Sequence, residues 1–275
     1  MLNRPVTSQQ DHESLQDDLR SLEAWEEEWE MSFHPDKCNT LPMTRSRTTK
    51  PHDYVLHDHQ LESVDAIKYL GVTIQKDAGW DKHINNVCAK ANSALGMLRR
   101  NLKIGSPKTK ELAYKSLVRP IVEYACTVWD PHKIKEVSQI EKVQRRAARF
   151  VLNRHKQTAS VDDMLNELEW PSLEERRKEA RLSMLKKITS GSAHVRCEEL
   201  HLLAPRARRG VPTERQQFKR IPARTNYRKN SFLPRTIRDW NETPSSLLLS
   251  HPQAPDSCTA QESSSCIVQE LPSPQ

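Results

Sequence analysis

Two acidic doublets are the first candidates for metal-dependent chemistry: Asp17-Asp18 and Asp162-Asp163. A polymerase needs carboxylates that converge on two metal ions. The first doublet lies inside a helix predicted over residues 11–31, where neighbouring side chains point about 100° apart. The second follows Ser160 in the first turn of another predicted helix, where acidic side chains interact favourably with the helix dipole. Both doublets are therefore predicted to serve helix electrostatics and not catalysis.

The run His57-Asp58-His59 has the composition of a metal-site fragment. On a strand, its two alternate histidines would lie on one face. However, no further His or Cys stands beside them at ligand spacing, and the paired cysteines of zinc sites are absent. A surface turn is favoured. No glycine-rich phosphate loop and no G-x-S-x-G turn occurs either. The sequence shows no enzyme active site, metal site or cofactor site.

Basic residues on two predicted amphipathic helices give the strongest signal. The helices are expected over about residues 80–102 and 134–152, with Ile134, Val137, Ile140, Val143 and Ala147 inward in the second. Their candidate nucleic-acid-binding residues are Lys90, Arg99, Arg100, Lys142, Arg145, Arg146 and Arg149. Such residues suit contacts with backbone phosphates, which require charge but little sequence readout. A helix bundle with a solvated basic surface remains the alternative.

The other predicted elements are short. Residues 54–74 indicate a hairpin that leads to a short strand, Tyr69-Leu70-Gly71-Val72-Thr73-Ile74. Ser106 is a candidate N-cap and Pro107 a first helical residue, for a helix to about residue 124 that Pro120 should disturb. Further helices are expected near residues 161–169 and 173–189. The predicted fold class is α+β and mostly α.

Charge is distributed unevenly along the 275 residues. Residues 99–156 hold fifteen basic and five acidic side chains, and residues 206–238 hold eleven basic and one acidic, whereas the first fifty are acidic. Concentrated positive charge favours a polyanionic partner. Hydrophobic residues make up 36% and the mean hydropathy is -0.79. Residues 204–238 are therefore expected to order only on a partner, and the last thirty or so residues to form a disordered tail.

The six cysteines are scattered, with no C-x-x-C pair. No apolar run approaches the length of a membrane span. A reduced, intracellular chain without a membrane partner is expected. The sequence does not distinguish nucleus from cytoplasm.

Ordered motifs run from about residue 10 to residue 245. They are Leu22-x-x-Trp25-x-x-x-Trp29-x-Met31-x-Phe33-His34-Pro35-Asp36-Lys37-Cys38, Lys68-Tyr69-Leu70-Gly71-Val72, Trp80-x-x-His83-Ile84, Ala113-Tyr114-x-x-Leu117-Val118-Arg119-Pro120, Glu123-Tyr124-Ala125, Val128-Trp129-Asp130-Pro131, Ile140-Glu141-x-Val143-Gln144-Arg145-Arg146-Ala147-Ala148-Arg149-Phe150, Leu168-x-Trp170-x-x-Leu173-x-x-Arg176-Arg177 and Ser231-Phe232-Leu233-Pro234-Arg235-Thr236-Ile237-Arg238-Asp239-Trp240-Asn241. In this order they resemble the C-terminal part of non-LTR (LINE-type, Jockey/CR1-like) retrotransposon reverse transcriptases.

The resemblance implies a domain order. Residues 1–78 would be the C-terminal remnant of the palm, 79–190 a helical thumb, 191–243 a basic connector and 244–275 a disordered tail. Lys37 would match a palm lysine proposed to act as a general acid, with His34 where the family usually has Asn. Tyr69, Leu70 and Gly71 would form the primer grip. The implied partner is an RNA–DNA or DNA template–primer duplex.

The family's catalytic aspartates, including its Tyr/Phe-x-Asp-Asp turn, would lie upstream of Met1. The chain alone is therefore expected to be inactive as an RNA-directed DNA polymerase. Mg²⁺ is expected only in the intact enzyme. The missing upstream palm and fingers would be a second partner. Two alternatives remain: a repurposed helical protein-interaction module with an exposed patch at Trp25 and Trp29, or a non-functional remnant of a decayed element.

Overall fold

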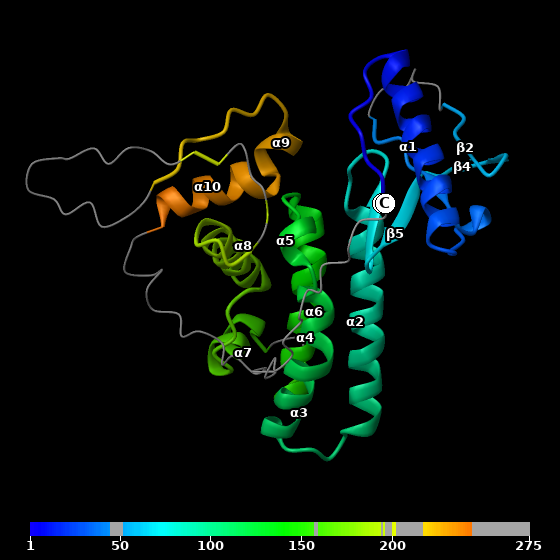
Figure 1. Ribbon diagram of the computed structural model, residues 1–275. Coiled ribbons are helices and arrows are strands. Elements are labelled where there is room, and N and C mark those ends of the chain that lie inside the picture. The colour runs from blue at the N-terminus through cyan, green and yellow to red at the C-terminus, as the bar shows by residue number, and fades with distance from the viewer. Residues whose placement is uncertain (45–51, 157–158, 194, 196–199, 202–216, 244–275) are drawn as a thin grey trace, which may run out of the picture.

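The computed structural model describes residues 1–44, 52–156, 159–193, 195, 200–201 and 217–243. In this part the chain is mostly helical, with three two-stranded sheets near the N-terminus (Figure 1). This agrees with an α+β, mostly α fold. None of the helices described is both long enough and apolar enough to cross a bilayer.

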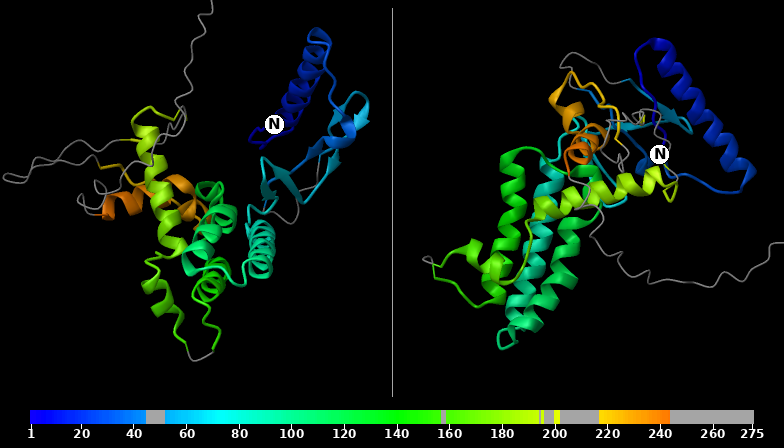
Figure 2. Two further views of the ribbon diagram at one scale, coloured as in Figure 1. Left: turned by 90° about the horizontal axis from the view of Figure 1, so that it is seen from below. Right: turned by 90° about the vertical axis from the view of Figure 1, so that its left-hand side faces the viewer.

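The N-terminal part is built around helix α1 (Gln9–Glu28). Ser8 begins this helix with a capping box, in which Ser8 and Asp11 bond each other's backbone amides. Strands β2 (Val55–Leu56) and β3 (His59–Gln60) form a hairpin, and β1 (Asn39–Thr40) pairs with β4 (Glu62–Ser63) in parallel. A small core of Tyr54, Leu56 and Leu61 packs against the apolar side of α1. The helix lies beyond the N-terminal end of α2 (Figures 1 and 2).

Strands β5 (Ala66–Tyr69) and β6 (Val72–Gln75) form an antiparallel hairpin that leads into the helical body. Leu70 and Gly71 connect them with φ of 45° and 83°. Two consecutive left-handed residues are typical of a type I′ hairpin turn. A hairpin is present, but the short strand predicted over Tyr69–Ile74 is wrong, because the turn at Leu70 and Gly71 divides that run between β5 and β6.

The helical body contains α2 (Asp81–Asn101), α3 (Pro107–Ala113), the π-helical turn η2 (Tyr114–Val118), α4 (Arg119–Glu123), α5 (Cys126–Trp129), α6 (Ile134–Val151), α7 (Val161–Glu167) and α8 (Leu173–Thr189). Its core is a continuous apolar cluster that includes Ile84, Val118, Trp129, Ile140 and Val143, each fully buried. Helices α2 and α6 lie against each other, and α8 packs on α5 and α6 (Figure 1).

Local signals set the helix boundaries as predicted. Ser106 accepts a bond from the Thr109 amide, and Ser160 does the same for Asp163. The disturbance at Pro120 takes the form of η2: the Arg119 amide bonds the Tyr114 carbonyl, five residues back. A π turn here lets the chain pass proline, which has no amide hydrogen to donate.

The predicted inward position of Ile134 is wrong, because its side chain is 84% exposed. Ile134 is the first residue of α6 and lies about 120° around the helix from the buried Ile140. Ile140, Val143 and Ala147 are inward as predicted, and Val137 is partly buried.

The expectation that residues 204–238 order only on a partner is wrong from residue 217 onward. Helices α9 (Asn226–Asn230) and α10 (Phe232–Glu242) fold within this chain, and α10 packs on α8. Phe218 and Ile237 are buried with Leu185 of α8. Sparse apolar residues suffice because Phe218 and Ile237 are buried against α8, and because Arg235 pairs with Asp130 in the helical body. Residues 204–216 and the predicted tail, 244–275, lie outside the described residues.

Candidate nucleic-acid interface

A line of basic and amide side chains follows one face of α6. Its members recur at four- and three-residue spacing, which places them on one side of a helix; they are Lys135, Gln139, Lys142, Arg146 and Arg149, and we call them the α6 ridge. All are exposed or partly exposed. The fourteen helical steps from Lys135 to Arg149 span about 21 Å along the axis.

The acidic residues of α6 lie away from this ridge. Glu141 accepts hydrogen bonds from the Leu173 and Glu174 amides at the start of α8, and burial raises its pKa. Glu136 is buried and bonds Lys133 at 3.0 Å. Because both carboxylates are engaged elsewhere, the ridge carries four cations with no acid among them.

Helix α2 supplies a neutral strip beside the ridge. Gln139 donates to the Asn85 side chain at 2.8 Å, and Arg146 donates to the Asn92 side chain at 2.9 Å. From the first pair to the second, the residue number rises by seven on both helices. Helices α2 and α6 therefore run in the same direction and in register. The Asn92 amide orients the Arg146 side chain without neutralising its charge. The resulting surface combines the ridge cations with the Asn85 and Asn92 amides, which suits contacts with phosphate groups.

The structure separates the seven basic residues predicted from the sequence. Lys142, Arg146 and Arg149 share the ridge. Arg99 lies one heptad beyond Asn92, and so on the ridge side of α2, with Arg100 next to it in the last turn.

The other two predicted residues lie elsewhere. Arg145 lies about 100° around the α6 axis from Arg146, and its guanidinium is 3.7 Å from the Asp162 carboxylate of α7. Lys90 is about 200° around α2 from Asn92, so it points away from the ridge. Asn85, Asn92 and Gln139 were missed because counting charges ignores amides. Asn85 and Asn92 precede Arg99 at seven-residue spacing, and Gln139 precedes Arg146 by seven residues. This spacing was the signal that could have placed the amides beside the basic residues.

The tip of the β5–β6 hairpin is fixed against the helical body. The Tyr124 hydroxyl donates to the Leu70 carbonyl at 3.0 Å, and the Tyr124 backbone carbonyl accepts from the Trp129 indole at 2.8 Å. Leu70 remains 73% exposed. A Cβ added to Gly71 would lie 3.2 Å from the Tyr124 ring. The predicted primer-grip residues thus form an exposed tip on a rigid support.

The remaining candidates for chemistry are surface features. Lys37 is exposed in the 3-10 turn η1 (Pro35–Lys37). His57 and Asp58 form the β2–β3 turn, as predicted, with left-handed backbone. Glu26, which is buried, bonds the His57 ring at 2.5 Å, and this bond raises the pKa of His57.

Both acidic doublets lie in helices, as predicted. Asp17 and Asp18 pair with Arg20 and Arg4. Ser160 caps the turn that holds Asp162-Asp163. Among the described residues, no three His, Cys, Asp or Glu side chains are grouped so as to hold a metal ion.

Several motifs of the C-terminal half converge on one buried charge cluster. Asp130 accepts from Arg177 and Arg181 at 2.8 Å each, and its carboxylate lies 3.2 Å from Arg235. Arg181 also pairs with Asp239 at 2.9 Å. We call these five residues the arginine cluster. It joins α8 and α10 to the chain segment after α5, so its motif residues Asp130, Arg177, Arg235 and Asp239 hold the fold together and are not available to a ligand.

The fold and surface thus define a mostly helical α+β protein with a basic ridge on α6 and an exposed hairpin tip. The chain is similar to three Drosophila melanogaster proteins. It is 23% identical over 169 residues to "Probable RNA-directed DNA polymerase from transposon X-element", covering 56% of this chain and 18% of that protein. It is 29% identical over 144 residues to the corresponding protein of transposon BS, covering 50% and 16%. It is 23% identical over 143 residues to "RNA-directed DNA polymerase from mobile element jockey", covering 50% and 15%.

These similarities confirm the resemblance to non-LTR retrotransposon RNA-directed DNA polymerases. The aligned part spans less than a fifth of each relative. No family model matches the chain, and no solved structure matches it.

Proposed function

We propose that this chain is the duplex-holding part of a retrotransposon-type RNA-directed DNA polymerase. The observation that carries the proposal is the α6 ridge, where four cations share one helix face and no acid interrupts them. A ridge about 21 Å long spans roughly six base steps of a duplex, at 3.4 Å per step. The ridge would contact the sugar–phosphate backbone of a template–primer duplex and hold it without reading its sequence.

The binding test uses a blunt RNA–DNA duplex and a series of salt concentrations. Each phosphate contact contributes roughly 0.9 to the slope of log affinity against log salt concentration. The variant Lys142→Ala/Arg146→Ala should therefore reduce the slope by roughly 1.8 and weaken binding about tenfold at moderate salt. Lys90→Ala/Lys178→Ala removes the same charge from exposed positions outside the ridge, and should have a much smaller effect. Equal losses in the two variants would contradict a defined interface.

The N-terminal part supports a further assignment within this function. We propose that residues 1–78 correspond to the end of the palm, and that the tip formed by Tyr69, Leu70 and Gly71 holds the primer 3′ end. The exposure of Leu70 and the support from Tyr124 favour this role. Lys37 remains the proposed general acid of the assembled enzyme. The Leu70→Ala variant should weaken binding of a recessed primer end more than binding of a blunt duplex.

The printed 275 residues contain no Tyr/Phe-x-Asp-Asp sequence. We propose that the chain by itself does not extend a primer, because the two-metal mechanism requires such carboxylates. A primed RNA template with Mg²⁺ or Mn²⁺ tests this, and template-dependent nucleotide incorporation above background would refute it. The catalytic carboxylates and Mg²⁺ would belong to the intact enzyme.

A second candidate function is a protein-interaction module. Trp25, Trp29 and Met31 are 37%, 61% and 53% exposed at the C-terminal end of α1, as expected for such a module. Exposed aromatic side chains are enriched at protein interfaces. A Trp29→Ser variant that keeps duplex affinity but no longer binds an upstream palm fragment would assign the patch to protein contact. Loss of duplex affinity in this variant would assign it to nucleic acid.

A further inference from the structure

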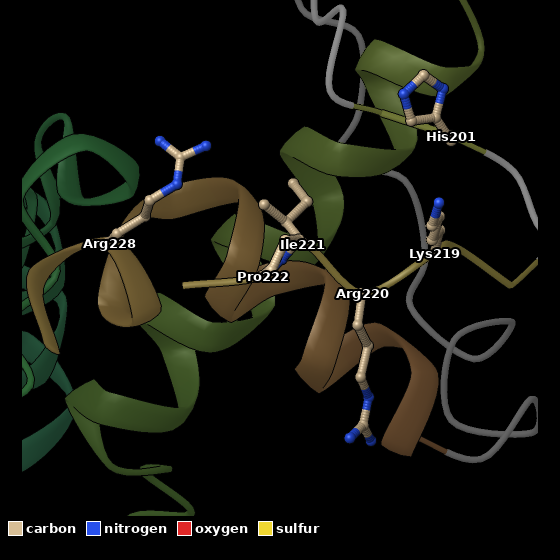
Figure 3. A pocket seen from close by; sticks show the side chains of 6 residues that line it. All are labelled: His201, Lys219, Arg220, Ile221, Pro222 and Arg228. Carbon is tan, nitrogen blue, oxygen red and sulfur yellow. The ribbon is translucent and has the colours of Figure 1, made fainter. Parts of the chain in front are cut away.

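A basic pocket lies outside the ridge, in the part of the chain expected to lack structure. It has a volume of about 240 Å³ and is lined by His201, Lys219, Arg220, Ile221, Pro222 and Arg228 (Figure 3). Three of these residues are permanent cations, one is a histidine, and none is acidic. Ile221 and Pro222 supply an apolar surface among the charges. This combination suits a ligand with both phosphate and apolar parts.

The pocket wall is preorganised by its neighbours. Phe218 is buried against Leu185 and Ile237, and its backbone exchanges two hydrogen bonds with the Asn241 side chain, at 3.2 and 2.8 Å. The Lys219 amide donates to the His201 carbonyl at 2.9 Å. The backbone that carries Lys219 and Arg220 is therefore held in place before any ligand binds.

The basic side chains do not converge on one point. In Figure 3, His201 and Lys219 lie near each other, while Arg220 and Arg228 extend in different directions. A single compact phosphate would require several of these groups to turn toward one centre. An extended strand would instead contact these basic side chains through separate phosphate groups. Arg220 lies 3.4 Å from Glu242, an exposed contact worth little in water.

The location of the pocket relates it to the ridge. Arg228 belongs to α9, whose Tyr227 ring packs edge-on against His132, with ring centroids 6.0 Å apart. His132 lies two residues before α6 begins, and three residues before Lys135 at the start of the ridge. One end of the ridge is therefore close to the helix that lines the pocket.

We propose that this pocket binds a single-stranded segment of nucleic acid that continues from a duplex held on the ridge. The proposal rests on the proposed function for its geometry, but uses different residues. A rigid duplex is too wide to enter a hollow of this size, whereas a single strand bends and turns its bases toward apolar or ring surfaces. His201, Ile221 and Pro222 provide such surfaces, and Lys219, Arg220 and Arg228 meet the phosphates.

The test compares a blunt duplex with the same duplex carrying a single-stranded overhang of about eight nucleotides. For the unmodified chain, the overhang should increase affinity about tenfold, since stacking of a base contributes about 1–3 kcal/mol. Lys219→Ala/Arg220→Ala should abolish this gain and leave blunt-duplex affinity within about twofold. Loss of two single-strand contacts should also lower the salt slope for the overhang substrate by roughly 1.4.

The matched control is Arg224→Ala/Lys229→Ala. It also removes one arginine and one lysine from the same segment, at exposed positions outside the pocket lining. The control should keep most of the overhang gain. An equal loss in both variants would show that only diffuse charge matters and would overturn the proposal. So would an equal loss of blunt-duplex affinity in the pocket variant.

Competition separates the possible sources of phosphate. Inorganic phosphate and a nucleoside monophosphate, each at about 10 mM and at constant ionic strength, should not displace the overhang. Displacement by either would assign the pocket to a compact phosphate ligand and overturn the strand proposal. Failure of the ridge itself has a different signature, because ridge variants would then leave blunt-duplex binding unchanged.

Discussion

Replacing Asp130 by asparagine removes the central carboxylate of the arginine cluster. This cluster is buried: the side chains of Arg177, Arg181 and Asp130 are 1%, 3% and 4% exposed. Water therefore cannot solvate the arginine charges once the carboxylate is removed. Within the described residues, both Nη atoms of Arg177 lack a hydrogen-bond partner. Asp130 is thus the one carboxylate that the Arg177 guanidinium hydrogen-bonds there. The amide keeps the shape of the site but leaves a buried cation uncompensated.

Breaking a buried ion pair from one side costs about 3–5 kcal/mol. A domain of this kind is stable by about 5–15 kcal/mol. The Asp130→Asn variant should therefore lose a large fraction of its free energy of unfolding, and about 4 kcal/mol corresponds to a roughly 700-fold change in the unfolding equilibrium. Urea denaturation followed by circular dichroism measures this loss. Hydrogen exchange should increase first in α10, which Arg235 attaches to the cluster.

Two further variants complete the experiment. Asp162→Asn removes an exposed carboxylate, 3.7 Å from Arg145, and should cost less than about 1 kcal/mol. Arg235→Met should cost less than Asp130→Asn, because three arginines face two aspartates and burial lowers the pKa of Arg235. A loss below about 1 kcal/mol for Asp130→Asn, or one equal to that of Asp162→Asn, would refute the reasoning.

Three more predictions follow from single contacts. Gly71→Ala should destabilise the chain by about 1 kcal/mol or more, because φ is +83° and the new Cβ would lie 3.2 Å from the Tyr124 ring; denaturation that matches the unmodified chain would contradict this. Burial lowers the pKa of His83, so its neutral form is favoured in the folded chain. The contribution of neutral His83 to the free energy of unfolding is complete above about pH 6.5 and is lost as pH falls. The His83→Asn variant retains an acceptor for the Thr73 amide, and should lose less stability than the unmodified chain in urea denaturation between pH 7.5 and 5.5. An unchanged pH dependence would contradict this prediction. Ser172→Ala removes the N-cap of α8 and should cost about 1 kcal/mol, whereas Ser183→Ala, at an exposed position within the same helix, should cost much less.

The sequence by itself determined the local elements of this protein. Ser106, Ser160 and Ser172 each bond an amide three residues later, so the information that starts each helix lies within one turn. The hairpin tip is equally local, since Gly71 adopts a left-handed turn at little cost. The ordered motifs also sufficed to identify the resemblance to retrotransposon reverse transcriptases.

Only the tertiary structure decided which charges face solvent and which are buried. Arg146 and Arg177 have the same side chain, yet one lies on the exposed ridge and the other is 1% exposed beside Asp130. Composition suggested that residues 217–238 lack structure, because it counts apolar side chains and cannot show that distant carboxylates will pair with the arginines. Burial and ion pairing depend on neighbours far apart in the chain, and those neighbours meet only when the helices pack.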